Sequence, residues 1–147
     1  MDKDFFAKLE AENEASEQEM IKRMKEWGET GPVLQIPEGT NIIEKGAYAS
    51  RDDIAKLVIP EGVVEIGDEA FIFCDQLVSV TLPSTLKKIG KSAFQDCVNL
   101  SEITIPEGLE KIGDAAFCNC LSLSIENIPQ GVKIGELAFH HTKTKID

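Results

Sequence analysis

A sequence repeat with a period of 23 residues constrains the fold of this chain more than any other feature. An aliphatic residue followed by proline recurs with the prolines 23 residues apart, at Ile36-Pro37, Ile59-Pro60, Leu82-Pro83, Ile105-Pro106 and Ile128-Pro129. The same step separates Ile43, Ile66, Ile89 and Ile112; Ala47, Ala70, Ala93 and Ala116; Tyr48, Phe71, Phe94 and Phe117; and Cys74, Cys97 and Cys120. Such units stack into a solenoid, because one unit cannot bury its apolar face alone.

Each unit carries the signals of one coil. In one copy, residues 100–105 place apolar side chains as a half-buried strand does, and Pro106 ends the strand because proline cannot donate to a strand ladder. A second short extended piece follows at residues 109–112. A tight or 3₁₀-like turn then directs Phe117 and Cys120 inward.

The chain has two parts, one without repeats and one with repeats. Five repeats occupy residues 31–147, of which the first (31–53) is degenerate and the last is one residue short. Strands of neighbouring coils pair about 4.8 Å apart in parallel. We therefore predict an α/β repeat solenoid, which is a leucine-rich repeat coil stack with a parallel β-sheet and short 3₁₀ or helical turns. Residues 1–30 carry no repeat signal and are predicted to form an N-terminal helical cap.

The repeat pattern resembles a known family. The consensus L-x-x-I-x-I-P-x-x-[VL]-x-x-I-G-x-x-A-F-x-x-C closely resembles the BspA-like leucine-rich repeat, from Gly31 to about Lys143. The resemblance implies a protein-binding solenoid of a kind often found on bacterial surfaces, without catalytic residues of its own.

Charge and composition exclude several classes of function. The formal charge is −11, so a surface that follows nucleic-acid phosphates would oppose the protein's own field. No run of 18 apolar residues and no basic segment followed by an apolar one occurs, so we expect no membrane span and a cytoplasmic protein. An extracellular location is expected if a targeting signal has been trimmed away.

The N-terminal segment is predicted to be one helix over residues 3–27, with two possible roles. Its large apolar residues gather at its two ends, with Phe5, Phe6 and Leu9 at the first and Met20, Ile21, Met24 and Trp27 at the second. In one interpretation the second end covers the exposed edge of the first coil, which otherwise invites strand addition. In the other, Phe5, Phe6 and Leu9 project as an anchor for a partner's groove or a homodimer.

Two parts of the solenoid are candidates for partner binding. The outward face of the strands includes Lys56, Val58, Thr81, Glu102 and Thr104, together with Val33, Gln35, Ser79, Ile125 and Asn127. These residues are small and mixed, which favours a solvated face. Ile72 and Phe73 fill positions that other copies give to polar pairs, so they form an exposed apolar patch or are covered by the helix or residues 49–53.

Catalytic, cofactor and metal sites are not expected. No Ser/His/Asp neighbourhood, phosphate-binding loop or dinucleotide glycine motif occurs. The three cysteines in one column are predicted to pack as a buried ladder of free thiols. Cys118 falls beside His140 and His141 in the next coil, but a fourth zinc ligand is missing, so only adventitious metal binding is expected.

These observations favour a non-catalytic protein–protein interaction module that binds no cofactor. One alternative is a small acidic intracellular inhibitor, of the phage type, that blocks a nucleic-acid-handling complex. Another is a surface adhesion fragment whose signal peptide is absent. The expected partner is a protein, and the chain is expected to be a monomer or an end-to-end homodimer.

Overall fold

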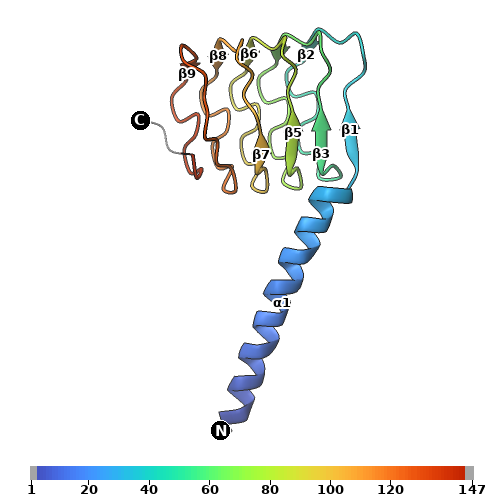
Figure 1. Cartoon of the computed structure of the whole chain (residues 1–147), viewed down its shortest axis with the longest axis vertical. Coiled ribbons are helices and arrows are strands. Elements are labelled where there is room, and N and C mark those ends of the chain that lie inside the picture. The colour runs from blue at the N-terminus through green and yellow to red at the C-terminus, as the bar shows by residue number, and fades with distance from the viewer. Residues whose placement is uncertain (1–2, 145–147) are drawn as a thin grey trace.

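A computed structural model describes residues 3–144 of the chain, with side chains described for residues 17–144. A long helix, α1 (Lys3–Thr30), precedes a stack of coils that carries two parallel sheets (Figure 1). The first sheet, sheet A, contains β1 (Val33–Gln35), β3 (Lys56–Val58), β5 (Ser79–Thr81) and β7 (Glu102–Ile103). The second, sheet B, contains β2 (Ile42–Ile43), β4 (Glu65–Ile66), β6 (Lys88–Ile89), β8 (Lys111–Ile112) and β9 (Lys133–Ile134).

The strand register follows the sequence period. Leu34 pairs with Leu57 and Leu57 with Val80, and each partner is 23 residues further along the chain. These central strand positions face the core, and both Leu57 and Val80 are buried. The predicted solenoid is therefore confirmed, and each coil contributes one strand to sheet B and, where regular, one to sheet A.

A column of stacked aromatic rings runs through the core along the solenoid axis. Consecutive rings lie 5.3–5.4 Å apart between centroids with interplanar angles of 1–9°, in the order Tyr48, Phe71, Phe94, Phe117 and Phe139. The three central rings have no exposed surface. Burial of each ring therefore depends on the coil before it and the coil after it.

The glycine of each Ile-Gly pair is required by contact between coils. A Cβ atom added to Gly90 would lie 2.6 Å from the backbone nitrogen of Asp68 and 2.7 Å from the carbonyl carbon of Gly67. No side chain fits between the two backbones at this distance. In the first coil the equivalent residue is Glu44, which has no coil before it among the described residues. The degeneracy of the first copy thus has a packing explanation.

The cysteines of the repeat also contact the preceding coil. Cys74, Cys97 and Cys120 are buried free thiols, as expected. Each donates its S–H to a backbone carbonyl of the preceding coil, at 3.3, 3.2 and 3.0 Å, on Tyr48, Phe71 and Phe94. The first coil has no preceding carbonyl among the described residues. Its equivalent residue, Arg51, instead pairs with Asp53 at 2.7 Å.

Burial of Cys97 predicts a dependence of stability on alkaline pH. Burial raises the pKa of the Cys97 thiol well above its ordinary value, which remains about 8.5 in the unfolded chain. The resulting stabilisation is complete below this unfolded pKa and decreases as the pH rises towards the folded pKa, by up to about 1.4 kcal/mol per pH unit. Between pH 7.5 and 10, the free energy of unfolding measured in urea should therefore fall less steeply with pH in Cys97→Ala than in wild type. Burial raises the pKa of the partly exposed Cys118 thiol to a smaller extent. Cys118→Ala should therefore reduce the alkaline loss less than Cys97→Ala does; equal slopes for all three proteins would contradict this prediction.

Of the two forms expected for the turns after sheet B, tight or 3₁₀-like, the structure shows tight turns. In the second coil two tight turns follow one another, closed by bonds from the Ala70 N–H to the Gly67 carbonyl and from the Cys74 N–H to the Phe71 carbonyl. The third residue of each turn is left-handed, with φ of 57° at Glu69 and 60° at Phe73. Phe71 and Cys74 point into the core, as expected.

One residue expected on the outward strand face is buried. The 23-residue count places Ile125 outward, but only 7% of its surface is exposed, whereas Glu126 is exposed. Strict register would bury Glu126, and an unpaired carboxylate is costly to bury. The chain shifts by one residue instead, which exchanges the faces of the strand. This coil adds no strand to sheet A, and the Ile125 N–H donates to Thr144 Oγ1 at 2.9 Å.

The N-terminal helix is longer than predicted and lies elsewhere. It continues through Gly28 to Thr30 and stops before Gly31 and Pro32. Its 28 residues span about 42 Å, and most of this length projects away from the coils (Figure 1). The side-chain hydrogen bonds at its C-terminal end join it to Gln76 and Lys56 of the second coil, and β1 is an edge strand that pairs with β3 alone among the described residues. The helix contacts the second and third coils instead, as described below.

Candidate binding surfaces

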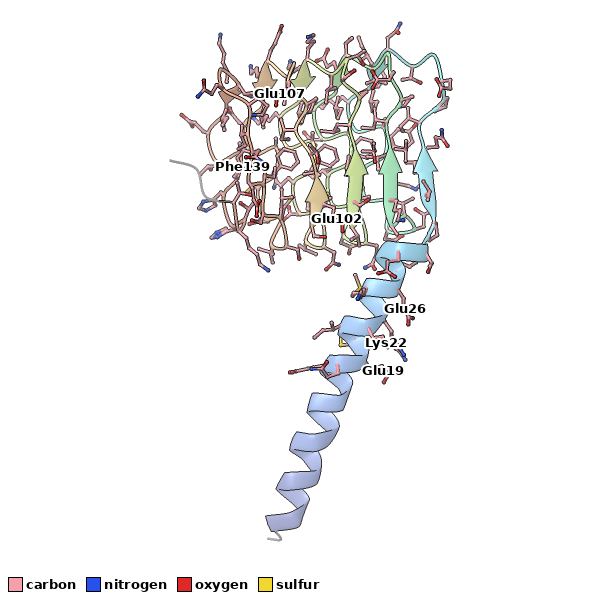
Figure 2. All side chains as sticks on the ribbon, viewed as in Figure 1. Glu19, Lys22, Glu26, Glu102, Glu107 and Phe139 are labelled. Carbon is pink, nitrogen blue, oxygen red and sulfur yellow. The ribbon has the colours of Figure 1, made fainter. Side chains whose placement is uncertain are left out.

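Sheet A brings most of the predicted strand-face residues onto one surface. The register aligns one row through Val33, Lys56, Ser79 and Glu102, and a second row through Gln35, Val58 and Thr81. Thr81, Glu102 and Thr104 are exposed, whereas Lys56 and Val58 are half-buried. Figure 2 shows Glu102 at β7, on the part of sheet A nearest the helix. The alternation predicted from the sequence is confirmed for these positions, with Ile125 as the exception.

Lys56 holds the helix in place. Its Nζ donates to the backbone carbonyl of Glu29 at 3.0 Å. The last turn of α1 contains no basic residue of its own, so Lys56 supplies the positive charge that stabilises a helix C-terminus. The structure gives this side chain a helix-anchoring contact, which the sequence did not indicate.

Trp27 and Gly28 complete the attachment of the helix. Trp27 Nε1 donates to the carbonyl of Gln76 at 2.7 Å, in the loop that leads into β5. A Cβ atom added to Gly28 would lie 2.9 Å from Val78 Cγ1, so glycine permits the helix to approach this coil closely. Met24 lies one turn before Gly28, whereas Met20 and Ile21 are 64% and 62% exposed.

A groove between α1 and sheet A was missed from the sequence. It has a volume of about 460 Å³, and Met24, Lys25 and Glu29 form its helix side. Its sheet side is formed by Lys56, Val78, Ser79, Asn99, Ser101, Glu102 and Ser122. The groove is polar and open, and its existence depends on how the helix docks. The sequence pattern predicted that Trp27 packs on the first coil and did not indicate this docking.

Phe73 lies exposed on a turn after sheet B. Its surface is 51% exposed, so neither α1 nor residues 49–53 cover it, while Ile72 beside it is half-buried. The backbone fixes this position firmly: the Phe73 N–H donates to the Gln95 carbonyl at 2.9 Å, and the Ser50 N–H donates to the Ile72 carbonyl at 2.7 Å. Of the two alternatives for this patch, exposure is the one that the structure supports for Phe73.

Phe73 is unusual in comparison with the residues at the same position of the other coils. Every residue in this column is left-handed, with φ of 58–61°, and the others are Ser50, Asp96, Asn119 and His141. Asn and Asp adopt this conformation most readily, and a residue with a bulky side chain is strained there. Asn119 also donates to Asp96 Oδ1 at 2.9 Å, so these polar residues bridge successive coils. Phe73 makes no such bridge.

The remaining sequence candidates do not form a site in the described part of the chain. Phe5, Phe6 and Leu9 lie on α1, outside the residues whose side chains are described. Among residues 17–144, no group of three or more metal-ligating side chains converges, so Cys118, His140 and His141 do not form a metal centre there. No helix in the described residues has the length and apolar character needed to cross a membrane.

The repeat geometry matches a known family model. The model of the BspA type leucine rich repeat region matches residues 33–146, in six copies. The chain belongs to this family. The family generally provides binding modules without catalytic activity, and the resemblance drawn from the sequence is confirmed. Comparison with curated proteins gave no match.

Solved structures of this family share the fold. A leucine rich cell surface protein from Faecalibacterium prausnitzii is 35% identical, with a TM-score of 0.71, over 79% of this chain and 32% of its own. The pneumococcal vaccine antigen PcpA is 28% identical, with a TM-score of 0.64, over 76% of this chain and 28% of its own. The leucine rich repeat protein of T. pallidum is 30% identical, with a TM-score of 0.54, over 67% and 58% respectively. The chain therefore spans less than two thirds of each of these proteins.

Proposed function

We propose that this chain is a protein-binding module and that Phe73 is at the centre of its contact surface. One observation carries the proposal: a large aromatic side chain is half exposed at a left-handed position that neighbouring coils fill with Asp96 and Asn119. Holding phenylalanine there costs about 1–2 kcal/mol relative to a relaxed backbone. Half of its surface remains in solvent, so burial within the coil returns only part of what a large aromatic side chain can contribute, and a contact with another molecule is the best account of this residue.

The surroundings of Phe73 resemble the anatomy of an interface. Ile72 supplies a half-buried apolar neighbour. In the adjacent first coil, Arg51 and Asp53 form a charged pair with Nε and Oδ1 2.7 Å apart, which raises the pKa of Arg51 and lowers that of Asp53. Protein interfaces typically have an apolar centre and a polar rim, and aromatic and arginine side chains often contribute most of the binding energy.

The test is a capture experiment with wild-type protein, Phe73→Asn and a matched control. Phe73→Asn copies Asn119, whereas Leu121→Asp removes another half-exposed apolar side chain by copying Asp75 at the equivalent position. We expect Phe73→Asn to weaken retention of the bound protein at least tenfold, which is the scale of a dominant aromatic contact, while Leu121→Asp leaves it unchanged. Equal retention by all three proteins would contradict the proposal, as would loss with Leu121→Asp alone.

Salt dependence separates this module from the acidic inhibitor considered above. An apolar contact at Phe73 predicts binding that tolerates a rise from about 0.1 M to 1 M salt, because screening weakens charge attraction and leaves apolar burial intact. Steep loss of binding with salt would instead support an inhibitor that presents its acidic side chains to a basic channel.

Surface location is the second candidate setting. The relative from Faecalibacterium prausnitzii is described as a cell surface protein and PcpA as a vaccine antigen, which supports surface adhesion over the cytoplasmic location expected from the sequence. Fractionation of the source cells, with protease added to intact cells, distinguishes the two. Digestion of the protein in intact cells supports the surface, and protection supports the cytoplasm.

End-to-end pairing also remains a proposal. On the last coil, Ile134 and Leu137 are 37% and 61% exposed, and these apolar side chains support pairing of two copies. The Lys143 N–H already donates to the Leu123 carbonyl at 2.8 Å, so part of this coil is occupied by the chain itself. Light scattering at high concentration tests the pairing, and a mass equal to the monomer would exclude it.

A further inference from the structure

The outer edge of β1 has no partner strand. β1 pairs with β3 alone among the described residues, so the opposite edge of Val33–Gln35 is unpaired there. Figure 1 shows β1 as the outermost strand of sheet A, with α1 below it in this view. Val33 and Gln35 are exposed, and Leu34 between them is half-buried. An edge with unpaired backbone groups is a template for an additional strand.

The hydrogen bonds to β3 show which backbone groups of β1 are free. The Ile36 N–H donates to the Val58 carbonyl at 3.0 Å, so Ile36 directs its N–H towards β3. In a parallel pair, alternate residues of a strand direct their backbone groups to the same neighbour. Leu34 therefore also faces β3. The N–H and C=O groups of Val33 and Gln35 point away from it, towards the open edge.

β1 has none of the usual features that protect an edge strand. Protected edges carry a charged side chain, a proline or a bulge, or they lie under another segment. The three residues of β1 are uncharged, and the nearest prolines, Pro32 and Pro37, lie outside the strand. The hydrogen bonds that attach α1 go to Lys56 and Gln76, on the side of β3 and β5. They leave the outer edge of β1 unpaired.

The core beneath β1 lacks cover on the same side. Leu34, Leu57 and Val80 are equivalent residues of successive strands. Leu57 and Val80 each lie between two strands of sheet A, and they are 0% and 5% exposed. Leu34 has a neighbouring strand on one side only among the described residues, and it is half-buried. An apolar residue of an added strand would complete its burial.

Glu44 excludes a whole coil from this end of the solenoid. In the later coils the equivalent residue is glycine, and a Cβ atom added to Gly67 would lie 2.6 Å from the Ile43 carbonyl oxygen of the preceding coil. A side chain in this column therefore points at the preceding coil. The exposed side chain of Glu44 fills the space that such a coil would need. The last coil of a second copy thus cannot stack here at the spacing found within the solenoid.

We infer that the open edge of β1 binds an extended segment of a partner protein, which adds to sheet A as a parallel strand. The segment places an apolar residue over Leu34 and exchanges backbone hydrogen bonds with Val33 and Gln35. A single strand is compatible with Glu44, because Glu44 follows β2 in sheet B and lies outside β1. This site is separate from the surface around Phe73 and does not depend on it.

The β3 segment provides a probe with known geometry. β3 lies against β5 in the register in which an added strand would lie against β1. A peptide with the sequence of residues 54–60 placed in this way puts its Leu57 over Leu34 of the protein. The Leu57 N–H of the peptide then donates to the Val33 carbonyl, and its C=O accepts the Gln35 N–H.

The test titrates this peptide into the full chain and follows the backbone amide shifts of the protein. Wild type should bind with a dissociation constant of about 1 mM or lower, from a few hydrogen bonds and one buried leucine. Gln35→Pro removes an outward N–H and leaves the bonds to β3 in place, whereas Gln35→Ala keeps the N–H and removes the same side chain. We expect binding about tenfold weaker for Gln35→Pro and unchanged for Gln35→Ala.

Changes in the peptide test the same contacts without altering the protein. N-methylation of the peptide at Leu57 blocks its bond to the Val33 carbonyl, and Leu57→Asp in the peptide places a carboxylate over Leu34. Each change should weaken binding about tenfold or more. The Phe73→Asn protein should bind the unmodified peptide as wild type does, because the two surfaces are separate.

Three results would overturn the inference. They are absence of binding to wild type at about 1 mM peptide, equal binding by wild type and Gln35→Pro, and equal binding of the N-methylated and unmodified peptides. A second copy of the chain is the other candidate occupant of the edge. Light scattering should give wild type and Gln35→Pro the same mass, and a smaller mass for Gln35→Pro would assign the edge to self-association instead. Circular dichroism confirms that each variant keeps its fold.

Discussion

Replacing Phe94 by alanine is expected to lower the free energy of unfolding by about 3–5 kcal/mol. Its ring is fully buried and stacks between Phe71 and Phe117, with centroids 5.3 Å from both. Alanine would leave a cavity in the middle of the aromatic column, and the fixed spacing of the coils prevents the neighbours from closing it. Urea unfolding monitored by circular dichroism measures the loss.

Phe139 provides the matched comparison. It is the last ring of the same column, stacks on Phe117 alone among the described residues, and is 8% exposed. Phe139→Ala should therefore cost less than Phe94→Ala, by about 1–2 kcal/mol. A larger loss at Phe139 than at Phe94 would contradict the view that rings are held from both sides by neighbouring coils.

Replacing Gly90 by alanine is expected to cost about 3 kcal/mol, although it adds a single methyl group. The new Cβ would lie 2.6 Å from the backbone nitrogen of Asp68, so the second and third coils must move apart. Their separation also weakens the bond from the Gly90 N–H to the Ile66 carbonyl, now 2.8 Å long. Thermal and urea unfolding of the variant measure this effect.

Gly108→Ala is the control for this substitution. The Cβ there would meet Lys87 Nζ at 3.1 Å, and the end of a lysine side chain moves easily. We expect a change below about 0.5 kcal/mol. If Gly90→Ala were equally harmless, close contact between coils would not be the reason for glycine in the Ile-Gly pair.

The sequence predicted the coil stack because several columns share one period. Proline after the strand, glycine before the turn and phenylalanine in the core each act within a coil or between adjacent coils. Their spacing in the sequence is therefore sufficient to predict the coil. The structure gives the physical reason for the degenerate first copy. Glu44 and Arg51 replace glycine and cysteine where no preceding coil exists among the described residues.

Features that depend on contact between distant segments were not predicted. Docking of α1 rests on Trp27 reaching Gln76 and on Lys56 reaching Glu29, pairs that no local pattern relates. The repeat spacing alone places Ile125 on the outward face. The shift that buries it arises because the alternative would bury the carboxylate of Glu126. Phe73, by contrast, was singled out because it breaks a column, and the structure added its left-handed backbone.

The most direct test of the proposed role of Phe73 is the free energy of unfolding of Phe73→Asn relative to wild type, measured in urea on the samples used for capture. If Phe73 serves binding, asparagine relieves backbone strain at φ of 60°, and stability should stay equal or rise by about 1 kcal/mol while binding is lost. A fall of more than about 1 kcal/mol would contradict the account, because Phe73 would then be held by packing within the solenoid.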